Sequence, residues 1–218
     1  MLLKEIISKD IKICTKETLS EEALQIIDTY KLTHIPIMES GNLLGNISEE
    51  NLLEILPAEK IENISSHLEK FQLYEKSSIF ETFKVFHLND TNIIPILNDK
   101  EKIAGVVLME EVISYFNKYS FFSEMGAILV LETPLQTYSI SEIGKIVESN
   151  NAKFYGILVT NITSDHVQIV IKISAENITS IGETFERFGY TILNKLYKDK
   201  KHDLINERYE QLVKYMTI

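Results

Sequence analysis

The segment "THIPIMESGNLLGNISEENLL", Thr33 to Leu53, decides the fold because its shape returns as "NIIPILNDKEKIAGVVLMEEVI", Asn92 to Ile113. Each copy places apolar residues around a proline and continues with a polar turn. A second apolar stretch containing a glycine comes next, and an acidic helix start closes the copy. An internal repeat decides architecture before any single residue does. The chain therefore contains two copies of one structural unit.

Each copy predicts the same order of secondary structure. An amphipathic helical pattern precedes each proline, in 19–31 and in 78–89, with Ser20 as the expected N-cap of the first helix. We expect Phe80 and Phe83 on the apolar face of the second helix. Two short strands around the polar turn follow, and a closing helix ends the unit. The repeat thus predicts an α+β fold with strand-helix-strand-strand-helix twice over.

The composition limits the classes of function. The 218 residues allow one large or two small domains, and the formal net charge of -10 argues against nucleic acid or a membrane surface as the main partner. Cys14 is the one cysteine, which excludes an intrachain disulfide, and we interpret it as a small apolar strand residue. The first residues have no uninterrupted apolar run, so we expect neither a signal peptide nor a membrane anchor and a cytoplasmic protein.

Residues 1–120 resemble a tandem pair of cystathionine-beta-synthase (CBS) domains, a Bateman module, with repeats at about 1–60 and 61–120. The resemblance rests on Pro36, Gly45, Ser48 and "ISEENLL" in the first copy, and on Pro95, Gly105 and "LMEEVI" in the second. The family pattern is Gly-apolar-x-Ser/Thr-x-x-Asp. It implies binding of an adenosyl ligand such as AMP, ADP, ATP or S-adenosylmethionine, with no catalytic residue, metal ion or other cofactor.

The resemblance also implies where such a ligand binds. A glycine lets the backbone approach the ligand, and the hydroxyl and acid at the closing helix suit a phosphate and a ribose. Apolar residues around the strand proline would sandwich the adenine. The nucleotide contacts implied in this way are Thr15, Thr18, Thr33, His34, Ile35, Pro36, Ser48, Asn51, Asn92, Ile94 and Glu111.

Several of these positions depart from the family pattern or have a structural alternative. Asn51 replaces the acid of the first copy, and Leu108 replaces the hydroxyl of the second, so we expect one usable site or none. Ser48 is equally explained as a helix cap, Thr15 and Thr18 by turn and cap chemistry, and His34 by packing. Acidic residues at both helix starts favour a monophosphate or another ligand of low charge over ATP; they are Glu49, Glu50, Glu110 and Glu111.

The C-terminal third has a different pattern, which predicts strands at 127–131, 154–160, 167–173 and 190–196 and helices at 141–149 and 178–188. This βαββαβ order is a ferredoxin-like plan. Residues 125–198 therefore resemble an ACT-like domain, and the whole chain is similar to bacterial acetoin-utilisation-like CBS proteins. The loop "ETPLQTYSIS" lacks the glycine of ACT domains that bind amino acids, so a dimerising or partner-binding role has equal weight. Helical spacing of apolar residues predicts a packing helix at 199–218.

Two functions remain open. The first is a regulatory protein that senses an adenosyl ligand through the CBS pair and relays it to the ACT-like domain or to an unknown protein partner. The second is a homodimeric scaffold with degenerate ligand sites, which Asn51 and Leu108 favour. An enzyme is the least supported class, because the sequence has no nucleophile-base spacing, metal-ligand cluster or glycine-rich phosphate loop.

Overall fold

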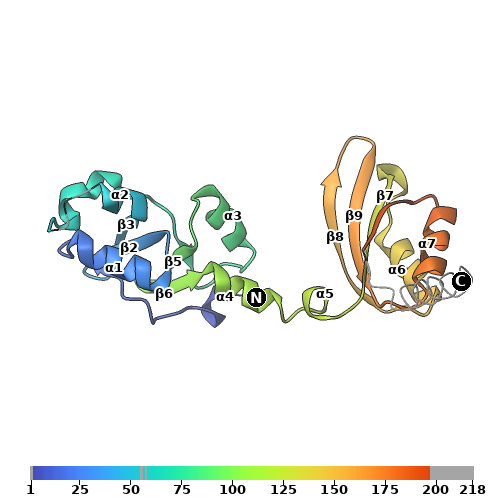
Figure 1. Cartoon of the computed structure of the whole chain (residues 1–218), viewed down its shortest axis with the longest axis horizontal. Coiled ribbons are helices and arrows are strands. Elements are labelled where there is room, and N and C mark those ends of the chain that lie inside the picture. The colour runs from blue at the N-terminus through green and yellow to red at the C-terminus, as the bar shows by residue number, and fades with distance from the viewer. Residues whose placement is uncertain (1, 55, 57, 197–218) are drawn as a thin grey trace, which may run out of the picture. The chain divides into compact units, whose positions relative to one another are not determined.

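The computed structural model describes residues 2–54, 56 and 58–196, and the chain divides into two compact units, Met1–Phe116 and Asn117–Ile218 (Figure 1). The helix predicted at 199–218 lies outside the described residues. Within the described part of the chain, no helix is both long and apolar enough to cross a membrane.

The first repeat in the first unit follows the predicted order. The parallel pair β1–β2 continues into the antiparallel hairpin β2–β3, which gives a three-stranded sheet. A short 3-10 helix, η1 (Leu3–Glu5), comes before it. The elements are β1 (Cys14–Thr15), α1 (Ser20–Tyr30), β2 (His34–Glu39), β3 (Asn42–Ser48) and α2 (Glu49–Leu53).

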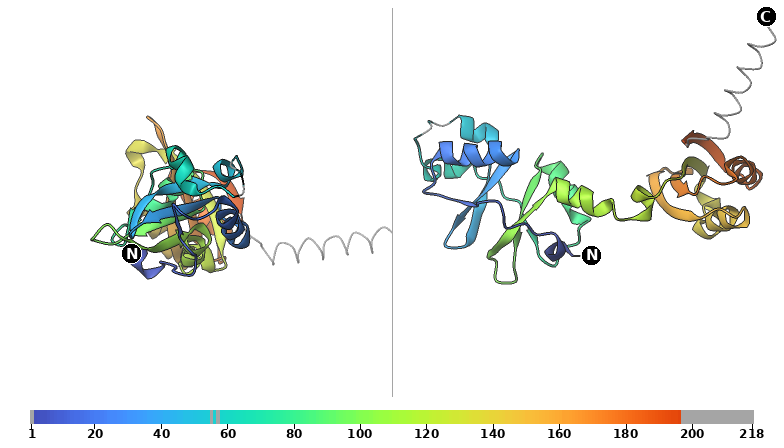
Figure 2. Two further views of the ribbon diagram at one scale, coloured as in Figure 1. Left: turned by 90° about the vertical axis from the view of Figure 1, so that its left-hand side faces the viewer. Right: turned by 60° about the horizontal axis from the view of Figure 1, so that its bottom comes forward.

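The second repeat has the same topology and the same register. Ile93 pairs with Leu108 as His34 pairs with Ser48, and both hairpins carry a register shift two residues after the proline. Figure 2 shows the two hairpins, blue and green, next to each other in the first unit. The elements are η2 (Ile61–His67), β4 (Leu73–Tyr74), α3 (Glu81–Leu88), β5 (Ile93–Leu97), β6 (Ile103–Leu108) and α4 (Met109–Phe116). The predicted repeat is confirmed.

Two details of the helices differ from the prediction. Ser20 is the first residue of α1 and does not cap it; Leu19 holds the N-cap position, and the Ser20 hydroxyl donates to the Leu56 carbonyl instead. Phe80 and Phe83 are 61% and 48% exposed, because the core contacts of this repeat are made by other side chains of the same segment. Helical spacing alone does not say which part of a wide apolar stripe meets the core.

Each repeat is completed by a segment that belongs to the other. The backbone of Ser8, before β1, exchanges two hydrogen bonds with Val106 of β6, and that of Glu69, before β4, exchanges two with Asn46 of β3. We name 7–8 and 68–71 the crossing segments. They pass close to Gly45 and Gly105, the glycines that the resemblance assigned to ligand approach. The missing side chains at these glycines therefore make room for a neighbouring segment of the same chain.

The second unit has the predicted ferredoxin-like plan. Its antiparallel sheet has the order β10-β7-β9-β8, and α6 and α7 cover one face (Figure 1). Alternate residues of β7 and β9 point into the core beneath these helices. The elements are α5 (Ser120–Ser123), β7 (Ala127–Pro134), η3 (Leu135–Thr137), α6 (Ile140–Ser149), β8 (Phe154–Ile162), β9 (His166–Ile173), α7 (Ile178–Arg187) and β10 (Thr191–Leu196).

Candidate functional site

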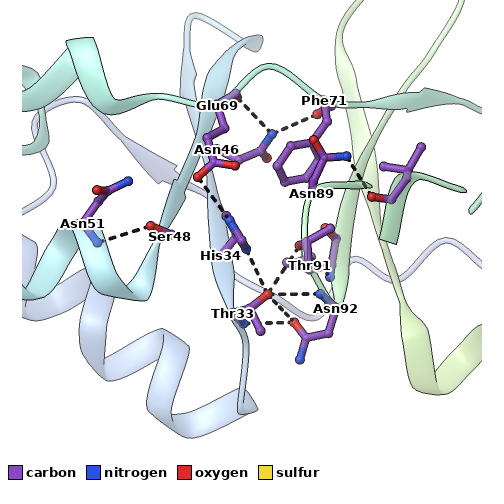
Figure 3. A network of polar contacts seen from close by, with 12 residues as sticks. Thr33, His34, Asn46, Ser48, Asn51, Glu69, Phe71, Asn89, Thr91 and Asn92 are labelled. Carbon is purple, nitrogen blue, oxygen red and sulfur yellow. Dashed lines mark hydrogen bonds and ion pairs between the residues drawn. The ribbon is translucent and has the colours of Figure 1, made fainter. Parts of the chain in front are cut away.

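The residues that precede β2 and β5 join the two repeats. Thr33 and Asn92 occupy the same position in the two copies, and each accepts a backbone N–H of the other through its side chain (Figure 3). Both bonds are 3.0 Å long, and the Asn92 amide also donates to the Lys31 carbonyl at 2.8 Å. This exchange fixes the contact between the repeats at two residues that the sequence assigned to a nucleotide.

His34 is held inside the protein. Its side chain packs edge-on against the Phe71 ring, with centroids 5.5 Å apart, and the residue is only 5% exposed. Nδ1 lies 2.9 Å from the Thr33 hydroxyl, and Nε2 lies 3.4 Å from a Glu69 carboxylate oxygen (Figure 3). Burial lowers the pKa of His34 from its usual 6.5, although Glu69 opposes the shift. The ring therefore joins β2 to a crossing segment, and both nitrogens have partners within the chain.

Asn46 on β3 fastens the same crossing segment. Its side-chain amide donates to the Phe71 carbonyl at 2.8 Å and approaches the Glu69 carbonyl at 3.4 Å (Figure 3). The residue is 1% exposed, and its Oδ1 has no hydrogen-bond partner among the described residues. Asn46 was not predicted as a functional residue, and the equivalent position in the second copy is Val106.

Two residues at the hydroxyl and acid positions of the family pattern accept backbone N–H groups at the first turn of a helix. The Ser48 hydroxyl accepts the Asn51 N–H at 3.2 Å as the N-cap of α2, and the Glu111 carboxylate accepts the Leu108 N–H at 3.0 Å at the start of α4. Burial raises the pKa of Glu111 despite that bond. The structural alternative proposed for Ser48 is thus present in the fold.

The remaining predicted contacts are engaged in turns and cores. Thr18 accepts the Thr15 N–H at 3.0 Å in the turn before α1. Ile35 and Ile94 are fully buried in the cores of the two repeats, and Pro36 is buried between core residues of β2. Buried side chains have no free surface for an adenine, so stacking on this trio would require the strands to move.

A cavity of about 270 Å³ lies where the repeats meet. The end of α1 forms one wall, and the start of α4 forms the other. Of the predicted contacts, its lining contains Asn92 and no other. It is lined by Tyr30, Lys31, Leu32, Asn92, Leu108, Met109, Glu110 and Ile113.

Sequence reasoning missed most of this lining, because each copy was considered by itself. The sequence offers no signal for it, because every aligned pair of the two copies is equivalent. The hydrogen bonds between Thr33 and Asn92 are what place this pair near the pseudo-two-fold axis that relates the copies. The chemistry of the lining is mixed, with Lys31 and Glu110 as its charged groups and Leu32, Met109 and Ile113 as apolar ones.

Over the described part of the chain, no group of three or more His, Cys, Asp or Glu side chains could hold a metal ion. The second unit has a groove of about 560 Å³ between α6 and α7, which includes Glu142 and Lys145. Glu142 accepts the Tyr190 hydroxyl at 3.0 Å, and burial raises the pKa of Tyr190. Asp165 and His166 lie at the turn between β8 and β9, where the backbone N–H of each donates to the Thr163 hydroxyl.

Comparisons with known proteins show similarity over part of the chain. The CBS domain family model matches residues 3–58. The CBS domain-containing protein MJ0729 of Methanocaldococcus jannaschii is 22% identical over 118 residues, 53% of this chain and 95% of that protein. Residues 3–58 therefore match the CBS domain family, and about half of the chain is similar to a CBS domain-containing protein.

Two solved structures are also similar to part of the chain. A CBS domain pair/ACT domain protein from Thermotoga maritima is 16% identical, with a TM-score of 0.48, over 53% of this chain and 96% of that one. CBSX2, solved in complex with AMP, is 12% identical, with a TM-score of 0.44, over 53% of this chain and 95% of that one. Each of these comparisons spans about half of the chain.

Proposed function

We propose that this chain is a non-catalytic regulatory protein that binds an adenosyl nucleotide or a related ligand through its CBS pair. The observation that carries the proposal is the cavity of about 270 Å³ between the repeats, which both copies line. Its volume is close to the lower end of the range for small-molecule sites, and its lining combines apolar side chains with a few polar groups, as such sites do. Ligand binding here would be sensed by both repeats at once.

The position of the cavity suggests how binding is relayed. Asn92 lines the cavity and also exchanges hydrogen bonds with Thr33 across the contact between the repeats. A ligand that engages the Asn92 amide competes with these bonds and changes the preferred packing of the repeats. Relay then requires that the ligand bind one packing better than the other, with the second unit or a partner protein as the receiver.

The charges of the lining select the ligand. Lys31 is its cation, but it is paired with Asp28 at 2.7 Å, while Glu110 adds a negative charge to the wall. One partly neutralised cation beside an acid suits at most one phosphate. We therefore expect AMP or S-adenosylmethionine to bind more tightly than ADP or ATP.

The test is a melting series of the purified chain with AMP, ADP, ATP and S-adenosylmethionine. A ligand at one hundred times its dissociation constant stabilises the folded state by about 2.7 kcal/mol, which raises the melting temperature by several degrees. Ile113→Trp fills the cavity from an exposed position of α4 and is expected to remove the shift. The matched control is Leu53→Trp, the equivalent exposed position of the first repeat.

Either variant also supplies a fluorescent reporter, because the chain has no tryptophan. A ligand shift that persists in Ile113→Trp would exclude the cavity as the site. A shift that disappears only in Leu53→Trp would move the site to Ser48 and Asn51 in the first repeat.

The alternative, a homodimeric scaffold with degenerate sites, is favoured by two observations. His34, Ser48 and Glu111 already have partners within the chain. The exposed rings of Phe80 and Phe83 meet the Phe116 ring on α4, with centroids 5.5 and 5.2 Å apart, and form an aromatic surface.

The scaffold would be supported if no ligand changed the melting temperature and if the average molecular mass in solution rose with protein concentration. Phe83→Asp is then expected to weaken the association at least tenfold without lowering the melting temperature, because Phe83 is half exposed. The measurement is sedimentation equilibrium of the variant and of the parent chain.

A further inference from the structure

The sheet of the second unit has an open face with an apolar centre. Burial alternates along β7, where Leu129 and Leu131 are fully buried under the helices while Val130 points the other way. Val130 pairs with Val170 of β9, which in turn pairs with Leu158 of β8. The three form a row across the face opposite α6 and α7, and Leu158 is 46% exposed.

The two ends of this face carry opposite charges. At one end Lys172 pairs with Ile128, and at the other Glu132 pairs with Gln168, whose amide donates to the Glu132 carboxylate at 3.0 Å. Among the described residues, neither Lys172 nor Glu132 has an ion-pair partner. We name Leu158, Val130, Val170, Lys172 and Glu132 the open sheet face.

The Lys172 end has a rim. Phe121 of α5 packs on Gly156, the residue of β8 that pairs with Lys172. Lys172 itself is only 9% exposed, although it belongs to the face opposite the two long helices. Removing a cation from water is costly unless an opposite charge lies nearby, and no acid among the described residues of this unit pairs with Lys172. A negative group from outside the unit would therefore stabilise Lys172.

We propose that the open sheet face binds the same face of a second copy of this chain. A two-fold axis that runs between the faces and across the strands places Val130 and Val170 over their counterparts. It also brings Lys172 of each copy over the end that holds Glu132 of the other. Stacked sheets lie about 10 Å apart, a spacing that side chains of this size fill. The contact is isologous, so it closes as a dimer.

Charge explains both the occupant and the orientation. The formal net charge of -10 makes two copies repel each other, so a contact between them needs a surface whose own charges balance. The open sheet face has one cation and one acid, and antiparallel stacking pairs them twice. A two-fold axis along the strands would instead oppose Lys172 to Lys172 and Glu132 to Glu132. This interface does not depend on ligand binding in the first unit.

Charge reversal in the full-length chain tests the proposal. Lys172→Glu and Glu132→Lys each leave like charges facing one another and are expected to raise the dissociation constant of this association at least tenfold. The double variant restores complementary ends in both copies and is expected to recover the parent constant within about threefold, the context dependence that electrostatic contributions show. Lys145→Glu, on the exposed surface of α6, is the control with the same change of charge. Sedimentation equilibrium measures all four.

Recovery of the association in the double variant also guards against misfolding, and the melting temperature of each single variant shows directly whether the nearly buried position of Lys172 tolerates the change. Single variants that associate as tightly as Lys145→Glu would overturn the proposal, as would a parent chain without association at this face. A double variant as weak as the singles would overturn the pairing. The single variants could instead lower the melting temperature by an amount that does not depend on protein concentration. That result would show that another part of the same chain covers the face, and it would overturn the proposal.

Discussion

At the scale of single residues, His34 illustrates how a motif position acquires another role. The CBS resemblance implies a nucleotide contact at this position. In the fold, the ring lies between Thr33 and Glu69, and both ring nitrogens have partners. A histidine used in this way ties a strand to a crossing segment, so its charge state affects stability.

The pH dependence of unfolding follows from the lowered pKa of His34. Below pH 6.5 the unfolded chain takes up a proton at His34 that the folded chain resists, so the contribution of this residue is present above that pH and is lost as the pH falls. We expect the free energy of unfolding to decrease from pH 7 to pH 5, as measured by urea denaturation. His34→Gln should flatten this dependence, and the exposed His67→Gln should not. An equal slope in His34→Gln and the parent chain would contradict the assignment.

Cys14 has the structural role expected from the sequence. It is fully buried in β1, and burial raises the pKa of its thiol to about 11. At pH 8 almost none of the thiol is ionised, so a disulfide reagent such as Ellman's reagent is expected to leave the folded protein unmodified. Unfolding in urea should release one reactive thiol per chain. Rapid modification of the folded protein would show that β1 opens readily.

At the scale of elements, Gly45 and Gly105 are needed for close approach. Both have a positive φ, 156° and 153°, and a Cβ at Gly105 would lie 2.4 Å from the Ser8 carbonyl oxygen. A Cβ at Gly45 would lie 2.8 Å from the Leu68 Cβ. Gly45→Ala and Gly105→Ala are each expected to lower the free energy of unfolding by about 1–3 kcal/mol, through strain and displacement of a crossing segment.

Gly144→Ala is the control for these two variants. Gly144 lies in α6 with open space around its Cα, and alanine there is expected to stabilise the protein by up to about 1 kcal/mol. Denaturant unfolding measures all three. A loss at Gly144 equal to that at Gly105 would remove the link to the crossing segments.

Secondary structure was largely predictable, and in the first unit the repeat presented each signal twice. The hairpins around Pro36 and Pro95 and the βαββαβ order of the second unit follow from periodicity and turn chemistry, and the structure confirms them. The crossing segments were not predictable, since 68–71 pairs with a strand of the other repeat and carries no pattern that names its partner. The cavity between the repeats was not predictable for the same reason, because its walls come from two copies.

At the scale of the whole molecule, both cores of the CBS pair and both crossing segments lie within Met1–Phe116. Residues 1–116 expressed alone are therefore expected to unfold cooperatively and to show the same ligand-dependent melting shift as the full chain. Circular dichroism melts with and without ligand measure both properties. A fragment that folds but ignores a ligand of the full chain would place residues of the second unit in the site.

The crossing segments give the first unit the character of an interlocked pair. Neither copy has its complete set of strand neighbours without the other, so deletion of one repeat removes part of the survivor as well. For the same reason, a chain cleaved between α2 and η2 should remain one particle, held by the hydrogen bonds of Ser8 with Val106 and of Glu69 with Asn46. The first unit thus behaves as a dimer whose two subunits are joined by a linker.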